Sequence, residues 1–216
     1  MIVRTFICAN FILSLSHITT HVSEAKSQPV EKDDKFLSSW IVLDIGMASG
    51  LLLQEVSKQG FSDLTGTDYS EGAIDLARSL ADRDGFSNIK FLVDDILETK
   101  LDRQFQLIMD KGTLDAIGLH PDGPIKRMMY WDSVSKLLAP GGILVSTLQG
   151  DYILQPYKRR IGARGGKFQS KERYDIPRNT ERPSPFRYLN QVRTYPTFMF
   201  GGSVGSLVAT VAFLRN

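Results

Sequence analysis

The sequence predicts a doubly wound α/β domain, in which a mostly parallel β-sheet carries helices on both faces. Short apolar runs, each long enough for one strand, alternate with longer segments whose apolar residues recur at helical spacing. Such alternation implies right-handed crossovers between parallel strands. Near the end of the chain, two β-rich runs are joined by a short glycine segment that cannot house a crossover helix, so we expect them to be antiparallel neighbours.

The chain is organised around residues 40–50, which are typical of a buried strand followed by a tight turn. Four apolar residues interrupted only by Asp44 form a run too short for a helix, and Gly46 and Gly50 close it. Apolar residues then return at helical spacing up to Gly60, so the turn opens a helix whose first N–H groups point back over the strand end. Glycine would let a ligand approach there, although two glycines also fit an ordinary strand-to-helix turn.

Four more strands follow, and acidic residues stand at or just after the ends of the first three. The predicted strands are Asp63–Asp68, Ile89–Val93, 105–109 and 143–147.

Two helices are predicted between these strands. Ser70 has the chemistry of an N-cap for the first, and Gly85 that of a C-cap. The second begins near Pro124 and stops at residues 140–142, which read Pro-Gly-Gly.

Composition narrows the classes of function. A chain of 216 residues that is 42% hydrophobic can bury one core. A net charge of +2 and a pI near 8.6 are too mild to indicate a nucleic-acid partner. Cys8 is the single cysteine and no Cys/His cluster has metal-ligand spacing, so we expect no disulfide and no metal.

Residues 1–37 are expected to form an N-terminal segment and linker ahead of a domain at 38–216. An apolar patch from Phe6 to Leu15 follows Arg4, as in a secretory signal, but no clean cleavage site comes after it. The patch is also too short to span a bilayer. We therefore expect a cytoplasmic protein with no membrane partner, secretion being the less favoured alternative.

Residues 148–188 interrupt the alternation of strands and helices. They are rich in Lys and Arg and show no sustained apolar period, which favours a basic, flexible insert over a substrate-binding patch. The two β-rich runs of the expected antiparallel pair come next, at 191–200 and 206–213. Pro196 in the first run suggests an edge position or a bulge.

Acids follow the first four predicted strands: Asp44, Asp68, Asp95 and Asp110. An open α/β sheet binds its ligand outside the carboxyl ends of its strands. Carboxylates there suit a ligand with hydroxyls and amines better than one with many phosphates. The first turn also lacks the Gly-x-Gly-x-x-Gly of dinucleotide sites, so the pattern favours the methyl donor S-adenosylmethionine.

These residues resemble the class I, seven-stranded S-adenosylmethionine-dependent methyltransferases. Four blocks extend the likeness to the lysine methyltransferases of translation elongation factor 1-alpha: 42–46, 66–70, 110–116 and 196–202. The block Asp-Lys-Gly-Thr-x-Asp-Ala is the most specific of them. The resemblance implies a Rossmann-like methyltransferase fold with a seven-stranded sheet and a C-terminal antiparallel hairpin, S-adenosylmethionine as cofactor, and a protein substrate, elongation factor 1-alpha, methylated on lysine.

The resemblance also implies roles for individual residues. The first turn would line the methionine end of the cofactor with Asp44, Gly46, Ser49 and Gly50. Asp68 would bind the ribose hydroxyls and Tyr69 would pack on the adenine, while Asp95 with Ile96 would lie at the adenine amine. Asp110 would face the methyl group and the incoming lysine, and we expect it to orient the neutral amine.

Two regions depart from the family pattern. The segment before Trp40 does not resemble the family's N-terminal helix, and Ala48 stands where the family usually has glycine. The basic stretch after Leu148 replaces the usual ending of strand five and the next helix. Both regions flank the site in the family, so the alternative hypothesis is a weak or inactive methyltransferase-like module that binds a protein; a nicotinamide dehydrogenase is a third.

Overall fold

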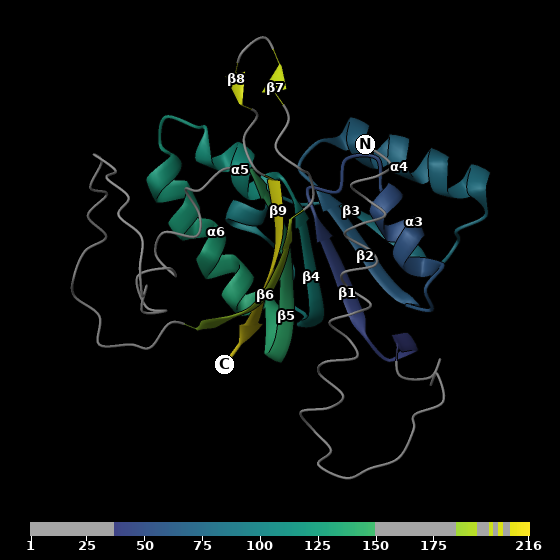
Figure 1. Cartoon of the computed structure of the whole chain (residues 1–216). Coiled ribbons are helices and arrows are strands. Elements are labelled where there is room, and N and C mark those ends of the chain that lie inside the picture. Colours follow the sequence, from purple (N-terminus) through teal and green to yellow (C-terminus); the bar gives the residue numbers. More distant parts are fainter. Residues whose placement is uncertain (1–36, 150–184, 194–198, 201–202, 205–207) are drawn as a thin grey trace, which may run out of the picture.

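The fold is a seven-stranded sheet with helices on both faces and a separate two-stranded hairpin (Figure 1). The computed structural model describes residues 37–149, 185–193, 199–200, 203–204 and 208–216. Strand order in the sheet is β3-β2-β1-β4-β5-β9-β6. The first five strands are parallel, and β9 runs antiparallel between β5 and β6. The predicted α/β fold with a mostly parallel seven-stranded sheet is confirmed.

The element bounds are as follows. The strands are β1 (Ile41–Ile45), β2 (Asp63–Asp68), β3 (Ile89–Val93), β4 (Phe105–Lys111), β5 (Leu138–Gln149), β6 (Phe186–Arg193), β7 (Met199–Phe200), β8 (Ser203–Val204) and β9 (Val208–Arg215). The helices are α3 (Leu51–Ser57), α4 (Glu71–Asp84), α5 (Thr113–Gly118) and α6 (Gly123–Leu137), with a 3₁₀ turn, η1, at Ile96–Glu98. No helix among the described residues is both long and apolar enough to cross a membrane.

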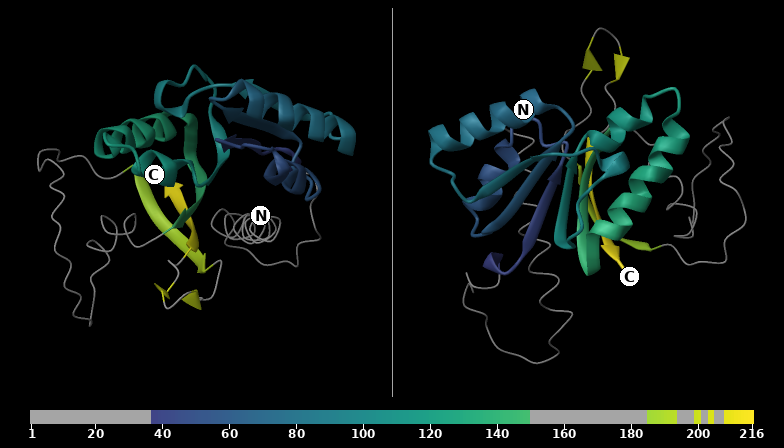
Figure 2. Two further views of the ribbon diagram at one scale, coloured as in Figure 1. Left: turned by 90° about the horizontal axis from the view of Figure 1, so that it is seen from above. Right: turned by 180° about the vertical axis from the view of Figure 1, so that it is seen from behind.

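Two hydrophobic cores lie on opposite faces of the sheet. Side chains alternate along a strand, so Val42 of β1 belongs to the core under α3 and α4, and Leu43 to the core under α5 and α6. Leu107 and Ile108 of β4 divide in the same way. Figure 2 shows the two helical layers on either side of the sheet. Burial on both faces explains why these strands read as continuous apolar runs.

The first three strands and the caps of α4 match the sequence predictions. Ser70 accepts a hydrogen bond from the Ala73 N–H at 3.4 Å, and Gly85 ends α4 with a φ of 81°. β5 differs, because it begins at Leu138 and its pairing with β4 skips from Leu138 to Ile143. The Pro-Gly-Gly sequence between them is therefore a bulge inside the strand rather than a stop before it.

The predicted antiparallel pairing of the two C-terminal strands is confirmed, but the predicted position of the first strand, 191–200, is wrong. β6 begins at Phe186, inside the predicted basic insert, and pairs with β9 from Phe186 to Arg193. The predicted run 191–200 instead supplies the end of β6 and the short strand β7, which forms a hairpin with β8. Pro196, residues 1–36 and most of the predicted insert lie outside the described residues.

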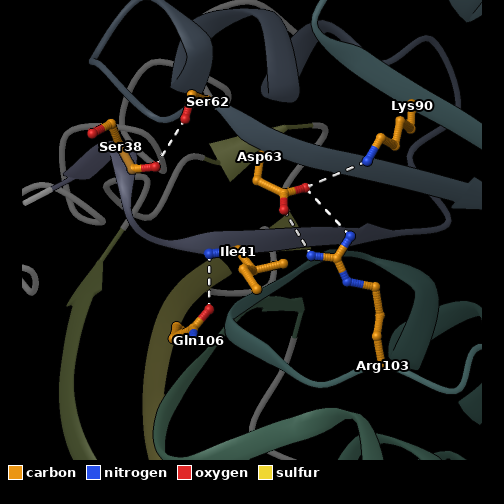
Figure 3. A network of polar contacts seen from close by, with 7 residues as sticks. All are labelled: Ser38, Ile41, Ser62, Asp63, Lys90, Arg103 and Gln106. Atoms are coloured by element: carbon orange, nitrogen blue, oxygen red, sulfur yellow. Dashed lines mark hydrogen bonds and ion pairs between the residues drawn. The ribbon is translucent and has the colours of Figure 1, made fainter. Parts of the chain in front are cut away.

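Polar side chains tie the amino ends of the strands together (Figure 3). Asp63 at the start of β2 accepts hydrogen bonds from Arg103 at 2.7 and 3.4 Å, and Lys90 of β3 lies 3.9 Å from it. The Ile41 N–H donates to Oε1 of Gln106 at 2.8 Å. These contacts lie at the edge of the sheet opposite the predicted acids, so we assign them to the fold.

Candidate functional site

The structure brings the four predicted acids to one edge of the sheet. β3, β2, β1 and β4 are consecutive neighbours, and Asp95, Asp68, Asp44 and Asp110 lie in that order at or just after their carboxyl ends. Asp95 is exposed, whereas the other three are 7%, 2% and 1% exposed respectively. Clustering of buried acids at a strand-end edge is the arrangement expected of a ligand site in an open α/β sheet.

The acids share an edge but not a face. Asp44 lies two residues after Val42, so its side chain points toward the α3 and α4 side of the sheet. Asp68 has the same phase on β2 as Leu64. Asp110 lies two residues after Ile108 and points toward α5 and α6. The sequence could not show this division because it depends on the phase of each strand at its last residue.

The glycine turn is held tightly between β2 and α5. Gly46 has a φ of +59°, and a Cβ placed on it would lie 2.1 Å from the hydroxyl oxygen of Thr113, so this position requires glycine. The Met47 N–H donates to the Thr67 carbonyl at 3.0 Å, and the Ala48 N–H donates to Oδ2 of Asp68 at 3.1 Å. Backbone contacts therefore fix the predicted methionine end of the site.

The remaining turn residues open α3. Gly50 stands at the N-cap of α3 with a φ of +69°, and Ser49 before it is half-buried. Ala48 has a φ of 52°, which is unusual for a residue with a side chain. That conformation explains why glycine suits this position, and it shows that alanine preserves the shape of the turn.

Asp44 carries an unsatisfied buried carboxyl. None of the described hydrogen bonds ends on its Oδ1 atom, although buried polar atoms are almost always hydrogen bonded. Burial raises the pKa of Asp44 to about 8; Lys111 opposes this shift, and the negative charges of Asp110 and Asp68 add to it. A ligand that brought a hydrogen-bond donor and positive charge to this carboxyl would therefore be stabilised there.

The residues predicted to hold a nucleoside differ in exposure. Asp68 accepts the N–H groups of Ala48 and Ser70 at 3.1 and 3.0 Å, which leaves one lone pair on each oxygen for a hydroxyl donor. Tyr69 is 79% exposed, so its ring is free to stack on a flat ligand. Asp95 accepts the Leu97 N–H at 2.9 Å and caps η1.

Ile96 and Asp94 complete that end of the edge. Ile96 is buried and packs in the core under α6. Asp94 accepts hydrogen bonds from the Thr99 hydroxyl at 2.6 Å and the Lys100 N–H at 2.9 Å, one on each oxygen. Asp95 is more exposed than Asp94 and accepts one described hydrogen bond rather than two, so its side chain has the larger free acceptor capacity for a ligand.

Both oxygens of the Asp110 carboxylate accept hydrogen bonds from other residues of the protein. Its Oδ1 accepts the Thr113 N–H at 2.7 Å, and its Oδ2 accepts the Leu114 N–H at 3.1 Å and the Tyr130 hydroxyl at 2.6 Å. Burial raises the pKa of Asp110, and these donors oppose the shift. The carboxylate thus binds the first two N–H groups of α5, whose N-cap residue is Gly112, and its predicted contact with a methyl group and an amine stays a prediction.

The sequence alone indicates no role for Tyr130 or Thr113 at the site. Tyr130 falls in the apolar stripe of α6, where an aromatic residue indicates only core packing. Thr113 belongs to the most specific family block, yet its hydroxyl donates to the Ile45 carbonyl across 68 residues of sequence, at 3.0 Å. Neither contact has a local signal.

A hollow of about 310 Å³ lies between η1 and α6. Its lining includes Leu97, Thr99, Met129, Ser133 and Lys136, and none of the predicted site residues. Among the described residues, no group of three or more His, Cys, Asp or Glu side chains could hold a metal ion. The strand-end edge is therefore the part of the fold where buried charge, a tight glycine turn and an exposed aromatic ring coincide.

Comparison with known proteins identifies the family. A family model described as a methyltransferase domain matches residues 37–161, more than half of the chain. The protein belongs to the methyltransferase-domain family. This methyltransferase domain is 36% identical over 176 residues to the human (Homo sapiens) protein named EEF1A lysine methyltransferase 2. The aligned residues make up 81% of this chain and 65% of the human protein.

A second relative is the Schizosaccharomyces pombe protein-lysine N-methyltransferase efm4, 32% identical over 80% of this chain and 68% of its own length. The methyltransferase domain thus spans about two thirds of the length of the relatives it matches.

Solved structures support the fold. The N-methyltransferase NodS from Bradyrhizobium japonicum WM9 superposes with a TM-score of 0.54 at 21% identity, covering 83% of this chain and 89% of that one. Magnesium protoporphyrin IX methyltransferase from Synechocystis PCC 6803 gives a TM-score of 0.58 at 13% identity, and the superposition covers 96% of this chain and 79% of that one. At such identities the likeness shows a shared fold, which agrees with the methyltransferase resemblance seen in the sequence.

Proposed function

We propose that the protein binds S-adenosylmethionine at the strand-end edge and transfers its methyl group to a lysine side chain of a protein. The observation that carries the proposal is the unsatisfied buried carboxyl of Asp44 beside a glycine turn, in a chain of the methyltransferase-domain family. The name of the human relative supports translation elongation factor 1-alpha as the substrate, and that of the Schizosaccharomyces pombe relative supports lysine in a protein. We also propose a cytoplasmic location, which imaging of a tagged full-length chain would test.

The described residues fit this cofactor. Asp44, with Gly46, Ser49 and Gly50, would hold the methionine end, where an ammonium group can supply the donor that Oδ1 lacks. Asp68 would accept hydrogen bonds from the ribose hydroxyls with its free lone pairs. Tyr69 would stack on the adenine, and Asp95 with Ile96 would lie at its amine.

The chain's contribution to the chemistry is alignment. Bound S-adenosylmethionine would supply a methyl group on a sulfonium; a lysine amine could form a bond to the methyl carbon in line with the breaking carbon–sulfur bond, with the neutral thioether as leaving group. Holding two reactants in register converts a bimolecular reaction into an effectively unimolecular one, so little acid–base chemistry is needed. The lysine must arrive neutral, because an ammonium has no lone pair, and a desolvated approach lowers its pKa. We propose that Asp110 serves this step chiefly by holding the start of α5 against the end of β4, through its hydrogen bonds to Thr113 and Leu114.

The test is methyl transfer from labelled S-adenosylmethionine to purified elongation factor 1-alpha. We expect label on one or more lysines with the wild-type chain and strongly reduced label with Asp44→Asn. Asp132→Asn makes the same chemical change at an exposed acid on α6, whose carboxylate is paired with Lys136 in the described part of the chain, and should retain full transfer. Absence of label with the wild-type chain would overturn this substrate. S-adenosylmethionine binding without transfer to any protein of a lysate would favour the binding-module alternative.

A further inference from the structure

Tyr130 is a buried hydroxyl that reaches the strand-end edge from α6. Its side chain is 0% exposed, and its hydroxyl donates to Oδ2 of Asp110 at 2.6 Å. Burial and the neighbouring carboxylate raise the pKa of Tyr130 well above its usual value, so the hydroxyl keeps its proton and remains a donor. The ring also packs edge-to-face on Trp131, with centroids 5.5 Å apart, so a phenylalanine at this position would keep the packing.

Hydrogen bonds continue from Asp110 to the glycine turn. Asp110 accepts the first N–H groups of α5, from Thr113 at 2.7 Å and Leu114 at 3.1 Å. Thr113 in turn donates its hydroxyl to the Ile45 carbonyl at 3.0 Å and fills the space where a Cβ of Gly46 would lie. Tyr130 is thus linked through two residues to the turn that would hold the methyl donor.

We propose that Tyr130 is a positioning residue for methyl transfer, which holds Asp110 and, through Thr113, fixes the glycine turn. The inference rests on the proposed function and deepens it. A carboxylate that is 1% exposed needs donors to remain charged, and Tyr130 supplies the only side-chain donor to Asp110 among the described hydrogen bonds. Without that hydroxyl, Asp110 keeps only backbone N–H donors, and the hydrogen bond that joins it to α6 is lost.

The charge of Asp110 provides a signature that a purely structural role would not produce. Burial raises its pKa, and the Tyr130 hydroxyl is the strongest of the groups that oppose the shift. Asp44 on β1 interacts electrostatically with Asp110, and Lys111 is the next residue of β4. Removing the hydroxyl lets the pKa of Asp110 rise further, so the carboxyl would stay protonated, and bind the N–H groups of α5 poorly, up to a higher pH than in the wild type.

The experiment compares Tyr130→Phe with Tyr188→Phe in the full chain. Tyr188 is a half-buried tyrosine of β6 whose hydroxyl has no hydrogen bond among the described residues, so it is a matched control. Calorimetry with S-adenosylhomocysteine should show about tenfold weaker binding for Tyr130→Phe, the size expected for one hydrogen bond to a charged group. With protein substrate, kcat should fall at least about tenfold at neutral pH while KM for that protein stays within about twofold.

The pH profile of kcat and the melting temperature distinguish a positioning role of Tyr130 from a purely structural one. For Tyr130→Phe the acid limb of the kcat profile should move to higher pH and part of the lost activity should return, whereas Tyr188→Phe should follow the wild type. If Tyr130→Phe melts at a lower temperature but keeps the wild-type affinity, kcat and pH profile while folded, the positioning role is overturned. A wild-type chain that neither binds S-adenosylhomocysteine nor transfers methyl groups would overturn the proposed function itself.

Discussion

Replacement of Asp44 by asparagine should make the folded protein more stable at neutral and alkaline pH. The pKa of Asp44 is raised from 3.8 to about 8 in the folded protein because the carboxyl is buried without a described hydrogen-bond donor. Between these two values the unfolded chain is ionised, while the folded chain must either keep the proton or bury the charge. Stability from this group is therefore greatest below about pH 4 and is lost as the pH rises toward 8.

The size of the effect follows from the shift. One pKa unit corresponds to about 1.4 kcal/mol, so at pH 7 the penalty for Asp44 is at most about 4 kcal/mol. Structural relaxation and partial water access reduce such penalties, and the asparagine NH₂ group also needs a partner, so we expect a gain of about 1–3 kcal/mol for Asp44→Asn at pH 7 to 8. Near pH 4 the two proteins should be almost equally stable.

Urea denaturation of the full chain at several values between pH 4.5 and 8.5 measures this difference. Asp132→Asn serves as the control, because its carboxyl is exposed and should give a difference that hardly varies with pH. The reasoning would be refuted if the difference in unfolding free energy between wild type and Asp44→Asn were the same across this range, or if the variant lost stability as the pH rose. A stabilised variant that has lost cofactor binding would show that the buried acid is retained for function at the expense of stability.

Three further substitutions test the turn and the edge. Ala48→Gly removes the strain of a left-handed alanine, so urea denaturation should show a gain of about 0.5–1 kcal/mol. Gly46→Ala should cost more than about 2 kcal/mol in the same assay, because the new methyl group would meet Thr113 and φ is positive there. Tyr69→Ala should leave the melting temperature unchanged, since the ring is exposed, while calorimetry should show S-adenosylhomocysteine bound about tenfold more weakly.

The sequence predicted those parts of the fold that have local signals. β1 is an apolar run closed by glycines, and β2 and β3 end at or just before acids, so local sequence was enough to find their limits. β1 and β2 are buried along almost their whole length, whereas β3 has an exposed face. β5 was started too late, because Pro-Gly-Gly usually ends an element and here forms a bulge. β6 was missed at its start because its sequence alternates apolar and polar residues next to a basic stretch, and only pairing with β9 defines its register.

The candidate site was predictable as an edge but not as a set of contacts. Sheet order follows from the fold class, so the acids Asp44, Asp68, Asp95 and Asp110 could be placed together. Which face each acid points to, and which donors each one meets, depends on long-range packing. The bond from Tyr130 to Asp110 is the clearest case, because it joins two residues on different elements, 20 positions apart, and no local pattern indicates it.

Calorimetric titration of the full chain with S-adenosylmethionine tests the central claim most directly. The account predicts saturable binding of one molecule per chain, markedly weaker binding to Asp44→Asn, and unchanged binding to Asp132→Asn. Absence of any binding heat at millimolar S-adenosylmethionine, with the chain folded, would contradict it.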